Sequence, residues 1–125
     1  MVKNWEKLIA LRKVKRVYEE PEKDDCYRIL VDRLWPRGLS KEKAKVDLWM
    51  KEVAPSNELR KWFSHDSGKW KDFKKKYEME LKDKEDLLNR IRQIEREKGT
   101  ITLLYSSKEE KYNNAVILDD FLRRL

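Results

Sequence analysis

The chain has 125 residues, of which 31 are Lys or Arg and 24 are Asp or Glu, so its formal net charge is +7. This length suits one domain with its own hydrophobic core, and we expect a single domain over residues 1–125. The positive charge is compatible with a nucleic acid or another polyanion as partner. Basic and acidic residues are nevertheless interleaved almost everywhere, which favours a densely charged surface of the thermophile type.

Several classes of protein are excluded by simple counts. A single cysteine, Cys26, excludes an internal disulfide and a cysteine-based metal cluster. The N-terminus lacks the apolar stretch of a secretory signal, and no run approaches the roughly 18 apolar residues of a membrane span. P-loop, GxGxxG, HExxH and EF-hand patterns are all missing from the sequence. We therefore expect a cytoplasmic protein that does not enter a membrane, with no cofactor and no metal site.

The first third of the chain predicts two strands. Apolar and basic residues alternate loosely over residues 11–18, which indicates a strand; a short helix capped by Asn4 is the alternative for the start of the chain. The polar residues 19–25 are expected to form a connection with one helical turn. The compact apolar run at residues 27–33 is the clearest strand, because turn-forming residues bound it.

The middle of the chain, from Ser40 to Lys98, has helical periodicity. Ser40 and Ser56 each precede a charged turn, as N-cap residues do, and Gly99 follows the last turn as a stop. Apolar residues recur at spacings of three and four, which places them on one face of each helix. The stripes expected to face the core are Trp70, Phe73, Tyr77 and Leu81 in one helix and Leu87, Leu88, Ile91 and Ile94 in the next.

The last quarter repeats the pattern of strand, loop and helix. Residues 100–105 form a buried strand, and a final helix carries an apolar stripe of Leu118, Phe121, Leu122 and Leu125. This alternation predicts an α/β fold: a small parallel sheet of about three strands flanked by helices, with Rossmann-like or flavodoxin-like layering and a helix-rich middle.

The candidate site lies where the strands end. The apolar run of the second strand stops at Asp32, and Arg33, Trp35 and Arg37 follow at once. In an open parallel sheet, ligands bind beyond the carboxyl ends of the strands. Residues 18–19, 32–38 and 106–108 are expected to converge there.

The residue types in this region point to an anion. The planar guanidinium of arginine binds oxyanions through two parallel hydrogen bonds, so we expect Arg33 and Arg37 to hold a phosphate or carboxylate. His65 and Asp32 are the candidates for proton transfer, because His65 is the only histidine and Asp32 stands at the strand end. The other side chains expected to contact the ligand are Tyr18, Trp35, Tyr105, Ser106, Lys108 and Asn113.

Each candidate also has a purely structural interpretation. Asp32 and Arg33 can pair with each other or with helix termini, and Arg37 can cap a helix or lie in solvent. Trp35 can serve packing alone, Ser106 is a common loop residue, and His65 is favoured near a helix C-terminus by the dipole. The sequence leaves these alternatives open.

Six segments carry a family resemblance from about Lys15 to the C-terminus. They are KRVY (15–18), YRILVDRLWPRG (27–38), PSNELR (55–60), WFSHD (62–66), TLLYS (102–106) and NNA (113–115). In these motifs the chain is similar to the DUF488 family, in the short branch that includes the bacterial YeaO proteins. The resemblance implies a small α/β domain with a parallel sheet and adds Arg60 to the anion-binding candidates. The family name stands for unknown function.

Two departures from the family pattern affect the candidate site. Many members have proline after the His-Asp pair, where this chain has Ser67 and Gly68, and this difference concerns the loop around His65. Many also have alanine at the position of Ser107, which argues against Ser107 as a required group.

Three functions are compatible with these observations. The leading hypothesis is an anion-binding pocket at the strand ends, used by a small-molecule hydrolase or an acid–base enzyme. The second is a nucleic-acid-binding module that uses the net positive charge, including the lysines at 74–76. The third is a non-catalytic interaction protein, and the sequence does not indicate the oligomeric state.

Overall fold

The structure is a computed structural model that describes residues 12–64 and 66–125. Its centre is a four-stranded sheet in the order β1-β4-β2-β3, and every pair of neighbouring strands is parallel. The strands are β1 (Lys13–Arg16), β2 (Tyr27–Leu30), β3 (Leu48–Trp49) and β4 (Ile101–Tyr105). This architecture confirms the predicted α/β fold with a small parallel sheet.

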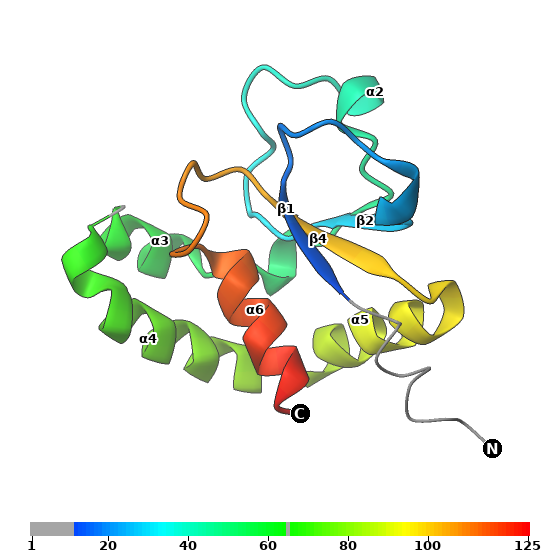
Figure 1. The fold of residues 1–125 in the computed structure, drawn as a ribbon. Coiled ribbons are helices and arrows are strands. Elements are labelled where there is room, and N and C mark those ends of the chain that lie inside the picture. The colour runs from blue at the N-terminus through cyan, green and yellow to red at the C-terminus, as the bar shows by residue number, and fades with distance from the viewer. Residues whose placement is uncertain (1–11, 65) are drawn as a thin grey trace.

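The described residues form five α-helices, which lie between and after the strands in the sequence. They are α2 (Lys41–Ala44), α3 (Asn57–Phe63), α4 (Trp70–Lys82), α5 (Glu85–Lys98) and α6 (Asn114–Arg123), with the 3-10 turns η1 (Lys23–Asp25), η2 (Lys51–Val53) and η3 (Ser67–Lys69). Helices α5 and α6 contact β4, and α4 packs against α3 and α6 (Figure 1). The helix-rich middle of the chain therefore folds back over one side of the sheet.

The two faces of the sheet are covered unequally because strand residues alternate between them. In β4, Ile101, Leu103 and Tyr105 belong to the main core beneath the helices, while Leu104 faces the other way. That second face is covered by a small cluster of Val17, Leu30, Ala44 and Leu104, with Trp35, Leu39 and Val46 packed against it. The layering is thus thick on the helical face and thin on the other.

Two sequence predictions are wrong in detail. Leu48 and Trp49 form a strand inside the region assigned to helices, and they pair with Ile29 and Leu30 of β2. A two-residue edge strand is too short to show a period, so only its pairing defines it. Leu125 is 54% exposed, because α6 ends at Arg123 and the last residues leave the core-facing stripe.

The predicted helix caps are confirmed. The side chains of Ser40 and Ser56 accept hydrogen bonds from the backbone N–H groups of Lys43 and Leu59. Gly99 ends α5 with a φ of 85°, a conformation that favours glycine. The predicted strand at 11–18 is shorter, Lys13–Arg16; Leu11 and Asn4 lie outside the described residues.

A buried ion network ties β1, β2 and η1 together. The Asp25 carboxylate is fully buried and accepts hydrogen bonds from Lys13 and Lys15, both at 2.9 Å, and from Arg28 at 2.5 Å. Its backbone carbonyl also accepts a hydrogen bond from Thr102 of β4. Three cations around one carboxylate compensate the cost of burying its charge.

This network predicts a specific pH dependence. Burial by itself would raise the pKa of Asp25, but hydrogen bonds from the Glu22 backbone and from Lys13, Lys15 and Arg28 outweigh it and hold that pKa well below its ordinary 3.8. The stability that the ionised carboxylate contributes is therefore complete above about pH 4 and is lost as the pH falls toward the folded-state pKa. We expect urea denaturation to show the stability difference between wild type and Asp25→Asn shrinking from about pH 5 to pH 2. A constant difference over this range would contradict the assignment.

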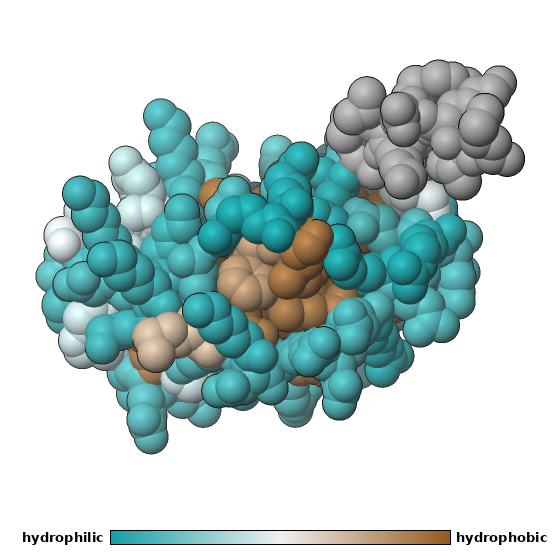
Figure 2. Space-filling view, turned by 90° about the horizontal axis from the view of Figure 1, so that it is seen from below, coloured by the Kyte–Doolittle hydropathy of each residue, from teal (hydrophilic) through white to brown (hydrophobic). Residues whose placement is uncertain are grey.

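The face of the molecule drawn in Figure 2 is hydrophilic over most of the area that the described residues cover. Seen from the side where α4, α5 and the end of α6 lie, one apolar patch is surrounded by polar and charged residues (Figure 2). Within the described part of the chain, no helix has both the length and the apolar character needed to cross a membrane.

Candidate functional site

A cleft of about 1110 Å³ opens at the carboxyl ends of the parallel strands. We refer to it as the strand-end cleft. Its walls come from the residues that follow β1, β2 and β4, from the segment before α3, from α3 itself and from the start of α6. Segments distant in the sequence meet here because all four strands point the same way.

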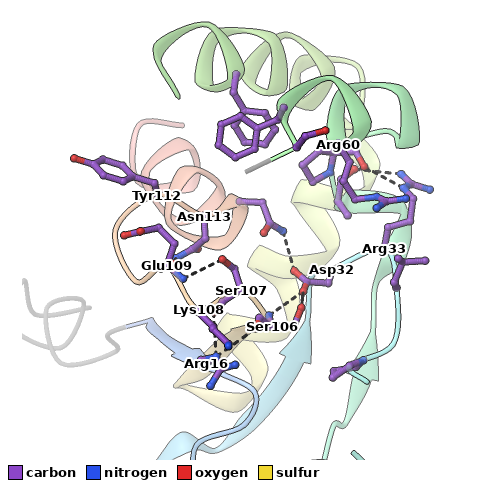
Figure 3. A pocket seen from close by; sticks show the side chains of 18 of the residues that line it. Arg16, Asp32, Arg33, Arg60, Ser106, Ser107, Lys108, Glu109, Tyr112 and Asn113 are labelled. Carbon is purple, nitrogen blue, oxygen red and sulfur yellow. Dashed lines mark hydrogen bonds between the residues drawn. The ribbon is translucent and has the colours of Figure 1, made fainter. Parts of the chain in front are cut away.

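Asp32 joins three elements at the floor of the strand-end cleft. Its Oδ2 accepts hydrogen bonds from the backbone N–H of Ser106 at 2.9 Å and from the Ser106 hydroxyl at 2.6 Å. Its Oδ1 accepts a hydrogen bond from the Asn114 amide at 3.2 Å, and the same amide donates to the Val31 carbonyl. The carboxylate therefore connects the ends of β2 and β4 to the first residue of α6 (Figure 3).

The environment of Asp32 opposes its charge. Burial raises the pKa of Asp32, and the hydrogen bonds from Ser106 and Asn114 offset this effect only in part. Within the described residues, no cation forms an ion pair with Asp32, and Arg33 turns away to other partners. The interpretation in which Asp32 pairs with Arg33 is therefore wrong.

Two arginines of the cleft are held by backbone carbonyls. Arg33 donates to the carbonyls of Pro55 at 3.0 Å and Ala54 at 3.2 Å, and Arg16 donates to those of Ser106 and Ser107. Carbonyls orient a guanidinium without neutralising it, so the full positive charge stays in the cleft.

The remaining cations are exposed. Arg37 and Lys108 are exposed side chains, and Arg60 makes one weak hydrogen bond of 3.3 Å to Asn57. Six Lys or Arg residues line the cleft against two acidic ones: Arg16, Arg33, Arg37, Arg60, Lys61 and Lys108 face only Asp32 and Glu109. Among the described residues none of these six cations forms a salt bridge, whereas the basic residues of the Asp25 network all do.

Figure 3 shows how the charges are distributed. Arg16 and Lys108 lie together on one side of Asp32, and Arg33 and Arg60 lie on the other side. The strand-end cleft therefore presents positive charge from two directions around a hydrogen-bonded carboxylate. A cleft lined mainly by one sign of charge has a positive electrostatic potential.

Aromatic side chains form parts of the cleft wall. Trp35 donates from Nε1 to the Leu39 carbonyl at 2.7 Å and meets Trp49 edge to face, so packing accounts for its position. The Tyr18 hydroxyl donates to the Arg37 carbonyl at 2.8 Å, and the Arg16 guanidinium lies 4.5 Å from the centre of its ring. Tyr18 thus connects the end of β1 to the loop that carries Arg37.

Three other sequence candidates have different positions. Asn113 lines the cleft, but its side chain caps α6 and donates to the carbonyls of Glu109 and Glu110. Tyr105 is only 4% exposed, belongs to the main core and does not line the strand-end cleft, because odd-numbered residues of β4 face the helices. His65 lies outside the described residues.

Several residues that line the cleft were not predicted from the sequence. Arg16 ends β1 and follows the same strand-end rule that identified Arg33, so this rule could have found it. Asn114 and Tyr112 could not be found in this way, because their positions depend on how the loop after β4 returns to α6. The missed lining residues with polar or aromatic side chains are Arg16, Lys61, Phe63, Ser64, Ser67, Phe73, Glu109, Tyr112 and Asn114, whereas Ser107 lies in the segment 106–108 that was expected here.

The polar groups around Asp32 and the cations of the strand-end cleft differ in how far they are paired with other described residues. The Ser106 hydroxyl donates a hydrogen bond to Asp32, and the two oxygens of Asp32 accept hydrogen bonds from all three surrounding donors. The acidic cluster elsewhere, Glu22 with Asp24 and Asp25, is bonded to Lys13 and Lys15 and works as an ion-pair network. The arginines and lysines of the cleft, in contrast, form no salt bridge with a described carboxylate.

Comparison with known proteins gives one consistent family. A family model described as the inactive DUF488-N3 subclade matches residues 12–125. The uncharacterized protein YeaO of Escherichia coli is 46% identical over 111 residues, which cover 89% of this chain and 96% of the relative.

Two mycobacterial relatives match a shorter part of the chain. The uncharacterized protein Mb3100c of Mycobacterium bovis is 46% identical over 71 residues, which cover 57% of this chain and 60% of the relative. The uncharacterized protein Rv3073c of Mycobacterium tuberculosis matches to the same extent. No solved structure matches the chain. The chain therefore belongs to the DUF488 family, in its YeaO-like branch.

Proposed function

We propose that the protein binds a small anionic ligand, a phosphate or carboxylate, in the strand-end cleft and does so without converting it. The observation that carries the proposal is the set of six cations that line the cleft and form no salt bridge with a described carboxylate. The surface is rich in Asp and Glu, so nearby carboxylates could have paired with these cations. Since they do not, the cations are available to a negative charge on a ligand.

Two further observations support binding over catalysis. Asp32, the described candidate for proton transfer, is hydrogen-bonded to Ser106 and Asn114 and holds the cleft together. The matching family model is described as an inactive subclade, which accords with a binding role for this member. We also infer a cytoplasmic location, in agreement with the unpaired and exposed Cys26.

To test this proposal, the full chain is titrated with inorganic phosphate and with pyrophosphate, and the affinity for each is measured by calorimetry. The variant Arg37→Ala/Lys108→Ala removes two exposed side chains that bond to no described residue, so its stability is expected to match wild type. We expect its affinity for the anion to fall at least about tenfold, because charge-assisted hydrogen bonds are lost.

Lys75→Ala is the matched control, since Lys75 is an exposed lysine of α4 that does not line the strand-end cleft. It is expected to change the affinity by less than about twofold. If the affinity for the anion fell equally in the control and in the cleft variant, the loss would come from the change in net charge alone. That result would contradict the proposal. Binding only of oligonucleotides, with a steep loss of affinity as salt rises, would instead support the nucleic-acid alternative.

A further inference from the structure

A chain of aromatic rings leads from the core to the rim of the strand-end cleft. Phe73 lies 6.2 Å from Tyr77, Trp70 lies 5.7 Å from Phe73, and Tyr112 lies 5.2 Å from Trp70, all between ring centres. Exposure rises along this series: Tyr77 is fully buried, Phe73 is 4% exposed and Tyr112 is 44% exposed. Tyr112 is therefore the outer ring of an aromatic row whose inner rings are fixed by the core.

Tyr112 combines an anchored position with open ring surface. Its tilted contact with Trp70 restricts the ring, so little further ordering is needed when a ligand contacts it. The residue lines the strand-end cleft and stands at its rim near Glu109 and Asn113 (Figure 3). Aromatic side chains with free surface beside a cationic groove are the usual stacking partners of planar rings.

The charge and the size of the cleft narrow the ligand class. Lys108 belongs to the same loop as Tyr112, between β4 and α6, and Arg16 lies beside it. Several cations match the charge of a phosphate monoester, which is close to −2 near neutral pH, better than the single charge of a carboxylate. A volume of about 1110 Å³ also exceeds what an inorganic anion needs and suits a small organic molecule.

We propose that the ligand of the strand-end cleft is a phosphate ester that carries a planar aromatic ring, as nucleoside monophosphates do, with the ring placed on Tyr112 and the phosphate on the cleft cations. This inference rests on the proposed function, because it assigns the substance that the anion-binding cleft takes. The inference adds a second contact, between Tyr112 and an aromatic ring of the ligand, to the binding of the phosphate by the cleft cations.

The experiment compares two probes that differ only in the ring. Adenosine 5′-monophosphate and ribose 5-phosphate are titrated into the full chain at the same pH and salt, and the ratio of their affinities is measured by calorimetry. We expect the nucleotide to bind at least about fivefold more tightly, since stacking on an aromatic side chain contributes this much or more. Tyr112→Ala should bring the ratio close to one, and Tyr112→Phe should preserve it.

Trp62→Ala is the control, because Trp62 is an exposed aromatic residue of α3 that does not line the cleft. Its affinity ratio should equal that of wild type, and thermal melting of all variants checks that they are folded. Equal affinities for both probes in wild type would overturn this inference and leave the anion-binding function standing. No binding of any phosphate would overturn both, and binding of a single-stranded oligonucleotide without binding of the mononucleotide would overturn it in favour of a nucleic-acid ligand.

Discussion

Asp25→Asn is expected to lower the free energy of unfolding by about 3–5 kcal/mol, as measured by urea denaturation at neutral pH. Asp25 is the central carboxylate of the buried network, and its removal leaves Lys15 and Arg28, which are 9% and 3% exposed, without a buried counter-charge. Most of the loss in stability comes from burying these two cations without a counter-charge, and less from the lost attraction to Asp25. Asparagine has nearly the same shape, so the loss would report charge and not volume.

Asp24→Asn provides the control for this experiment. Asp24 is the neighbouring residue and also pairs with Lys13, but its side chain is 77% exposed. An exposed ion pair contributes little, so we expect a loss below about 1 kcal/mol. If both variants lost the same amount, or if Asp25→Asn lost less than about 1 kcal/mol, the network would not have the structural role assigned here.

Asp32→Ala is expected to lower the free energy of unfolding by about 2–4 kcal/mol. The change removes the acceptor of two donors of Ser106 and of one bond from Asn114, which join β2, β4 and α6. Although burial disfavours the charge of Asp32, removing the whole side chain leaves partly buried donors without a partner, and that cost is larger. Denaturation monitored by circular dichroism gives the measurement.

Ser106→Ala separates the two parts of this effect. It deletes the hydroxyl bond to Asp32 but keeps the backbone N–H bond at 2.9 Å, so we expect a smaller loss of about 1 kcal/mol. A loss as large as that of Asp32→Ala would assign the stability to the hydroxyl alone. An unchanged stability in Asp32→Ala would show that the carboxylate does not join the three elements.

Local patterns determined much of the fold. The stripe of Phe73, Tyr77 and Leu81 in α4 is buried as its spacing predicts, because residues three and four apart share one face of a helix. Ser40 and Ser56 begin their helices because a serine oxygen can accept a backbone N–H of the first turn. These properties depend only on neighbours in the chain.

The sequence also indicated where the candidate site lies. Asp32 and Arg33 follow a buried strand, and the parallel arrangement brings that point together with the loop after β4. The motifs of residues 27–38 and 55–60 indicated the DUF488 family, which the comparisons confirm. Residue order alone is sufficient for such conclusions, because strand ends and motifs are local features.

The partners of each side chain were decided only by the tertiary structure. The length and composition of a strand do not show which other strand it pairs with. The position of β3 at the edge of the sheet is therefore known only from its pairing with β2. Asp32 bonds to Ser106, 74 residues away, instead of to the adjacent Arg33. Tyr105 is buried while Arg16 and Tyr112 reach the strand-end cleft, because the side of the sheet and the course of the β4–α6 loop place them. Contacts between distant segments depend on how the whole chain packs, and no local pattern encodes that.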